Sequence, residues 1–144
     1  MPTVEFTNLH RDKVLNELVS VDKELRDSFK KYLHNEYKGD KSKRLDYVDI
    51  AEIARFVVDK FQKQQTIAFQ PFFDKVENIL GNCDTDIENL IVVGLFESIQ
   101  NNCGSEIDYH FVFNRWLGNL SKQKWDKLID SWEGAEWRVK YKQI

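Results

Sequence analysis

Acidic residues are concentrated in one stretch near the middle of this chain. Between residues 73 and 114, a single basic residue, Lys75, stands against eight acidic ones, a net charge of −7, whereas the whole chain carries −3. Carboxylates in such numbers can bind metal ions, transfer protons, cap helices or attract a basic partner. The eight residues are Asp74, Glu77, Asp84, Asp86, Glu88, Glu97, Glu106 and Asp108.

The spacing of Asp84, Asp86 and Glu88 resembles the start of a calcium-binding loop. Such a loop requires glycine at its sixth position and glutamate at its twelfth, and these places hold Asn89 and Leu95. None of the three histidines has a partner at the spacing of zinc ligands. The sequence therefore predicts neither a metal site nor a cofactor.

Two further interpretations of the acidic stretch remain open. In the first, Asp84, Asp86 and Glu106 cap helix N-termini, and the other carboxylates form a solvated surface. In the second, the stretch is a docking surface for a basic partner, because concentrated negative potential accelerates and orients association. The residues expected on that surface are Asp84, Asp86, Glu88, Glu106 and Asp108.

A catalytic interpretation would rest on Glu97 and His110. Glu97 adjoins an apolar segment and must find water or a partner, for which Arg55, Arg115 or a backbone amide are candidates. His110 can titrate near neutrality, but no serine, cysteine or aspartate stands near it in the pattern of an activated nucleophile. The sequence favours a protein that is not an enzyme, and a small enzyme using Glu97 and His110 is the alternative.

All four tryptophans lie in the last 29 residues. The first three, at positions 116, 125 and 132, have the spacing of inward helix faces, which predicts core packing. Trp137 stands next to Arg138 in the segment EWRVKYK and is the one expected to be exposed. An exposed tryptophan would anchor a binding partner.

The two cysteines, Cys83 and Cys103, are expected to be reduced thiols in a cytoplasmic protein. The charged N-terminus lacks the apolar region of a signal peptide. The longest uncharged apolar run, residues 89–96, is far shorter than the roughly 20 residues that cross a bilayer, so no membrane contact is expected. Overall acidity disfavours nucleic acid, since the basic run 38–44 is interrupted by Asp40.

The elements that must position these residues are predicted to be helices. Apolar side chains recur at helical intervals, and no turn signal joins two strand-like runs. With 144 residues and 42% hydrophobic content, we expect one all-α domain, residues 1–144, forming an irregular bundle of about seven helices; a short α-solenoid is the alternative. The pattern predicts a break at residues 20–22, a helix capped by Asp46 and a helix from Pro71 to Gly81. A central helix is predicted from about Ile87 to Gln100, begun by Asp84 or Asp86. Two further helices are predicted after it, one from about Tyr109 to Leu120 and one from Ser121 to Gly134.

The segment ENLIVVGLFESIQNN, residues 88–102, joins an apolar helix to an exit rich in Glu, Gln and Asn. It is similar to segments of the small, acidic, helical immunity proteins of contact-dependent growth inhibition and related polymorphic toxin systems. The resemblance covers the middle third of the chain and transfers no particular residue. It implies a bacterial cytoplasmic protein that binds one cognate toxin domain, often a nuclease with a basic cleft, and blocks it stoichiometrically.

Resemblance and charge together predict an immunity protein that neutralises its toxin through an acidic surface. A helical scaffold or regulatory subunit without a toxin partner is the alternative. The sequence leaves the oligomeric state open.

Overall fold

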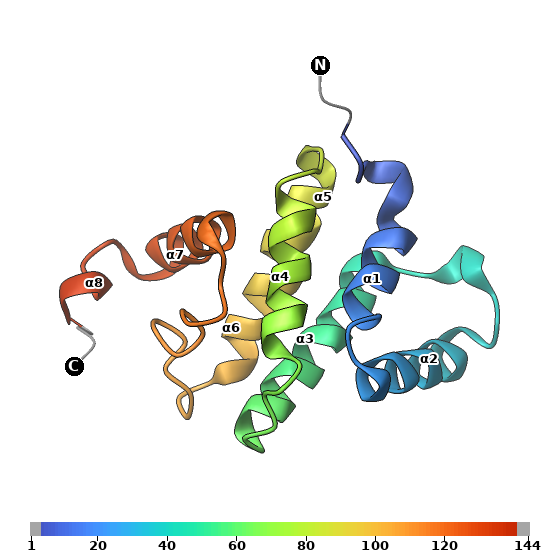
Figure 1. Cartoon of the computed structure of the whole chain (residues 1–144), viewed down its shortest axis with the longest axis horizontal. Helices are drawn as coiled ribbons and strands as arrows, with labels where there is room; N and C mark the ends of the chain where they lie inside the picture. The colour runs from blue at the N-terminus through green and yellow to red at the C-terminus, as the bar shows by residue number, and fades with distance from the viewer. Residues whose placement is uncertain (1–3, 141–144) are drawn as a thin grey trace.

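The computed structural model describes residues 4–140 as an irregular bundle of helices (Figure 1). The prediction of an all-α chain is confirmed. Within the described residues, β-type pairing is limited to an isolated parallel bridge between Phe6 and Cys83, which ties the N-terminal segment to the turn before the central helix. The Phe6 amide donates a hydrogen bond to the Asn82 carbonyl over 2.9 Å, and the Asp84 amide donates one to the Phe6 carbonyl over 3.0 Å.

The helices follow one another through short connections, and three of them form one continuous central helix. In chain order they are α1 (Arg11–Val19), α2 (Lys23–Tyr37), α3 (Asp46–Gln62), α4 (Phe69–Leu80), α5 (Thr85–Asn89), the π-helical segment η3 (Leu90–Phe96), α6 (Glu97–Cys103), α7 (Asn119–Glu133) and α8 (Trp137–Lys140). Short 3₁₀ turns, η1 (Asn8–His10) and η2 (Lys41–Lys43), precede α1 and α3. Counted with α5, η3 and α6 as one, the described residues contain seven helices, as expected.

Several helix boundaries follow from local side-chain chemistry. Asp22 caps α2 by accepting a hydrogen bond from the Leu25 amide over 2.9 Å, which explains the predicted break before it. Asp84 caps α5 in the same way, through the Ile87 amide over 2.9 Å. The predicted cap at Asp46 is wrong: Leu45 holds the cap position, and Asp46 is the first helical residue.

The central helix crosses α3 at close range. Leu90, Ile91, Leu95 and Phe96 are fully buried, as expected for a central helix, whereas Val93 is 46% exposed. Gly94 faces α3, and a Cβ atom placed on it would lie 2.7 Å from Cγ2 of Ile50. The two backbones therefore approach more closely than any side chain at position 94 allows.

The predicted helix from Tyr109 to Leu120 is wrong. The chain forms successive turns between α6 and α7, in which Asp108 accepts a hydrogen bond from the His110 amide over 3.1 Å and so competes with helical bonding. The apolar positions were nevertheless identified correctly, because Phe113 and Trp116 are buried. They contact Phe61 and Phe69 with ring centroids 5.1 and 4.9 Å apart, so aromatic packing holds these turns in place.

A carboxylate from another helix begins α7. The helix starts after Gly118, not at Ser121, and Glu77 of α4 accepts hydrogen bonds from the amides of Leu120 and Ser121, each over 2.9 Å. Burial alone would raise the pKa of Glu77, but the hydrogen bonds from Ser121 and Leu120 outweigh it, so its pKa lies below its ordinary value. Gly118 leaves room for this contact, since a Cβ there would lie 2.4 Å from the Glu77 carboxyl carbon.

We predict that Gly94→Ala destabilises the protein by about 1–3 kcal/mol, because the added methyl group overpacks the contact with Ile50. Urea denaturation followed by circular dichroism measures the effect. Gly81→Ala is the matched control, since its Cβ would meet its neighbours at 3.6 Å or more. Equal stability of the two variants would contradict the proposed close approach.

Both cysteines are free thiols in the structure, one before the central helix and one at its end. Burial raises the pKa of Cys83 to about 11 and that of Cys103 to about 12. We therefore expect native protein at mildly alkaline pH to react slowly with a thiol reagent, and unreduced protein to yield both thiols immediately after denaturation. Recovery of no thiol from the denatured sample would show a disulfide and contradict this expectation.

Candidate functional site

The structure separates the predicted acidic docking surface into two groups. Asp84, Asp86 and Glu88 lie at the start of the central helix, whereas Glu106 and Asp108 follow its end. The 19 residues of the central helix, Thr85 to Cys103, stand between the two groups. We therefore treat the first turn of α5 and the turn after α6 as separate surfaces.

The first group combines capping with exposure. Asp84 accepts hydrogen bonds from the amides of Ile87 and Asn8 over 2.9 and 2.8 Å, and the bond from Ile87 is the main reason that its pKa is lowered. Glu88 forms an ion pair with Lys124 of α7 over 3.2 Å. Asp86 between them is exposed. Asp84 and Glu88 are thus held in place, and Asp86 between them faces solvent.

In the second group, Glu106 is exposed and lines a hollow with Arg115 and Trp116, whereas Asp108 belongs to a clamp of two carboxylates around His110. The Nδ1 atom of His110 lies 2.5 Å from Asp108, and its Nε2 atom lies 3.0 Å from both carboxylate oxygens of Glu133. Burial would lower the pKa of His110, but the hydrogen bonds that its ring donates to Glu133 and Asp108 outweigh it and raise the pKa. Burial would likewise raise the pKa of Glu133, yet hydrogen bonds from Tyr109 and His110 lower it.

Trp137 is buried, with only 2% of its surface exposed, so the expectation that it is an exposed anchor is wrong. The segment after α7 folds back, and the Trp137 indole N–H donates to Asp130 over 2.7 Å. The Trp137 ring also lies 5.5 Å from that of His110. The prediction of core packing is wrong for Trp132, which is 49% exposed and donates to the Gln100 side chain over 3.2 Å.

The alternative catalytic pair is not assembled in this structure. Both ring nitrogens of His110 are engaged by Asp108 and Glu133, and neither is engaged by Glu97. The arginines expected to pair with Glu97 have other contacts: Arg55 pairs with Glu52 on its own helix, and Arg115 lies 4.3 Å from the Trp116 ring.

A buried aspartate that sequence reasoning did not single out ties α2 to α3. Asp49 is fully buried and accepts hydrogen bonds from the hydroxyls of Tyr32 and Tyr37 over 3.0 and 2.7 Å. Its other oxygen lies 3.3 Å from Nε of Arg44. Burial and the hydrogen bond to Asp49 raise the pKa of both tyrosines, which keeps them neutral donors. This cluster has a structural role.

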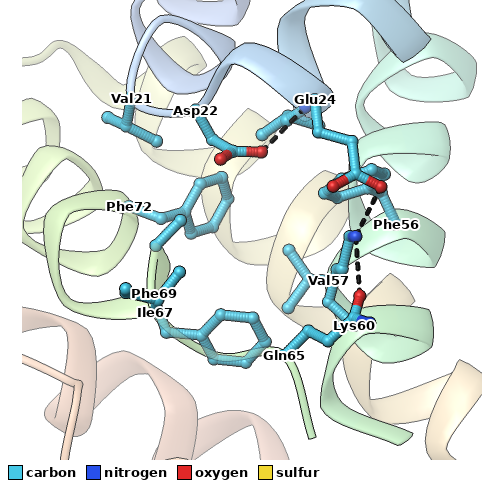
Figure 2. Close-up of a pocket in the computed structure, with 12 residues that line it drawn as sticks. Val21, Asp22, Glu24, Phe56, Val57, Lys60, Gln65, Ile67, Phe69 and Phe72 are labelled. Atoms are coloured by element: carbon cyan, nitrogen blue, oxygen red, sulfur yellow. Dashed lines mark hydrogen bonds and ion pairs between the residues drawn. The ribbon is translucent and has the colours of Figure 1, made fainter. Parts of the chain in front are cut away.

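A pocket of about 320 Å³ lies between the start of α2, the C-terminal half of α3 and the start of α4 (Figure 2). Its walls are largely apolar: Phe69 and Phe72 face Val57 across the open centre. Most ligand sites have this character, an apolar concavity with few polar groups. The chain also places an isoleucine, Ile67, at the pocket with 95% of its surface exposed.

The cationic group of this pocket is Lys60, of which only 8% is exposed. Its ammonium donates to Glu24 over 2.5 Å and to Gln65 over 2.9 Å, and it lies 5.3 Å from the Phe56 ring centroid (Figure 2). The sequence held a signal for this lysine: it continues the inward series of α3 three residues after Val57. A lysine at an inward helix position is rare without a paired role.

Comparison with known proteins gives a family. Residues 15–133 match DUF7674, a domain of unknown function. The chain belongs to the DUF7674 family. Among curated proteins and among solved structures, nothing matches it. The part of the chain assigned to DUF7674 runs from α1 to the end of α7, so it contains both acidic surfaces and the pocket but not Trp137.

Two structural findings bear on this DUF7674 chain as a whole. Within residues 4–140, no helix is both long and apolar enough to cross a membrane. Among the same residues, no three histidine, cysteine or acidic side chains come together as a group that could hold a metal ion.

We predict that the His110 clamp makes stability fall as pH rises. The folded pKa of His110 lies above its ordinary 6.5, so the clamp stabilises fully below that value and loses its effect as pH rises through the folded pKa. Calorimetry from mildly acidic to mildly alkaline pH should show Tm falling. His110→Gln should remove this component, while His34→Gln, at an exposed position, should keep it. Identical pH profiles for wild type and His110→Gln would contradict the clamp.

Proposed function

We propose that this DUF7674 protein is a cytoplasmic immunity protein that binds a cognate toxin domain and blocks it stoichiometrically, without catalysing a reaction. The observation that carries the proposal is the first turn of α5, where Asp84, Asp86 and Glu88 stand together at the surface on an anchored helix. Carboxylates fixed before binding lose little conformational entropy when a partner docks.

The mechanism follows from charge and geometry. Toxin domains that act on nucleic acids present basic clefts to phosphate groups, and carboxylates form charge-assisted hydrogen bonds with the same arginine and lysine side chains. Asp86 would enter such a cleft, with Asp84 held at its side by the amides of Ile87 and Asn8. Occupying the cleft excludes the substrate.

The segment that resembles immunity proteins, residues 88–102, supports this proposal only by its place in the fold, beside the acidic turn. Its apolar part, Leu90 to Phe96, lies largely in the core, so it positions the acidic turn and does not itself form a contact surface. Glu106 and Asp108 belong to the distant second group, and Asp108 is occupied by His110. We therefore assign the toxin contact to the first group.

The decisive experiment uses the toxin domain encoded by the gene directly upstream. Co-expression of the present protein should restore growth of cells that produce this domain. The double variant Asp86→Lys with Glu88→Lys should slow association by about tenfold or more at low salt and invert its salt dependence, because attraction becomes repulsion, which salt screens. Stopped-flow mixing at several salt concentrations measures the rate.

The matched control reverses the same amount of charge elsewhere, with Asp27→Lys and Glu36→Lys on the exposed side of α2. This control should associate at the wild-type rate. Thermal unfolding verifies that both double variants fold. An upstream gene without a toxin domain, or equal slowing by both double variants, would overturn the proposal and favour the scaffold alternative.

A further inference from the structure

The proposed function assigns no role to the pocket beside Lys60. A lysine with nine-tenths of its surface buried stands at the edge of an apolar cavity that opens to solvent. Its ammonium carries three donors, of which Glu24 and Gln65 accept two. One N–H is thus left over for a further acceptor beside the apolar walls.

We propose that this pocket binds a small monocarboxylic acid with an apolar body, whose carboxylate pairs with Lys60 while its chain lies among the aromatic rings. The walls that would receive the chain are Phe56, Val57, Phe69 and Phe72. The inference goes beyond the proposed function and is independent of it, because the two sites share no residue.

The size of the cavity limits the size of the acid. Liquid water occupies about 30 Å³ per molecule. A space of about 320 Å³ therefore holds an acid of about ten non-hydrogen atoms, on the same scale of about 30 Å³ per heavy atom. Octanoate has this number of non-hydrogen atoms and is therefore a suitable probe of the pocket.

The charges around the pocket select a carboxylate over a phosphate. Lys60 is the cation of the pocket lining, whereas Asp22 and Glu24 bring two negative charges to the same lining. A dianionic phosphate would meet about twice the repulsion from both that a singly charged carboxylate meets, and the carboxylate gains Lys60 as its partner when Glu24 turns to solvent. Glu24 is also replaceable as a partner of Lys60, because 67% of its side chain is exposed and can return to water.

The mouth of the pocket also favours an apolar ligand. Ile67 belongs to the connection between α3 and α4 and is 95% exposed, an unfavourable position for an isoleucine in water. The chain turns sharply just before it, since Gln64 has a φ of 59°. An acyl chain in the pocket would cover part of the Ile67 side chain.

Titration of ¹⁵N-labelled full-length protein with octanoate tests the proposal. We expect saturable chemical-shift changes, confined to the start of α2, the C-terminal half of α3 and residues 65–72. Lys60→Met should weaken binding by about tenfold or more, because the cation is lost while the apolar lining stays. Glu24→Gln should tighten binding, because it removes the competing carboxylate.

Two controls keep the test decisive if Lys60→Met is poorly folded. Lys63→Met removes a lysine that pairs with Asp59 outside the pocket, and it should bind octanoate as wild type does. Octan-1-ol has the same chain without the charge and should bind wild type much more weakly. Absence of saturable octanoate binding, or equal binding of octanol, would overturn the proposal.

Discussion

The close approach of α3 and the central helix at Gly94 is the contact on which the rest of the packing depends. With no side chain at this position, Ile50 lies directly against the backbone of η3. The central helix is therefore buried, and α7 packs on η3 and on α4, while α1 and α2 pack against α3. Figure 1 shows the result, with α1 and α2 on one side of the central helices and α7 and α8 on the other.

This arrangement explains where polar chemistry lies in the molecule. The apolar segment η3 lies largely in the core and carries no charge, so the charged residues of the central helix, Asp86, Glu88 and Glu97, lie before and after it. The acidic stretch that is continuous in sequence becomes two surfaces in space. The pocket forms where the C-terminal half of α3 meets the beginnings of α2 and α4. Lys60 lies on one of those last turns.

Features set by neighbouring residues were predictable from the sequence, and features set by distant contacts were not. The caps at Asp22 and Asp84 depend on amides three residues away, and the burial of Leu90 depends on an apolar run, so the sequence contains both. Trp137 is different, because its burial depends on Asp130 and His110, which the fold brings together.

The turns after α6 and the pocket are likewise determined by contacts between residues far apart in the sequence. The residues from Tyr109 to Trp116 fit a helical pattern, but contacts with Phe61 and Phe69 and the side chain of Asp108 determine their backbone. The pocket walls come from three helices, so only the inward position of Lys60 was visible beforehand.

The capping of α7 by Glu77 has a consequence for the order in which the molecule assembles. The first amides of α7 receive their hydrogen-bond acceptor from α4, 43 residues earlier in the chain. An isolated segment from Gly118 onward lacks that acceptor, and short helices are marginal in water by themselves. We therefore expect α7 to form cooperatively with the docking of α4, and synthesis from the N-terminus delivers α4 before α7.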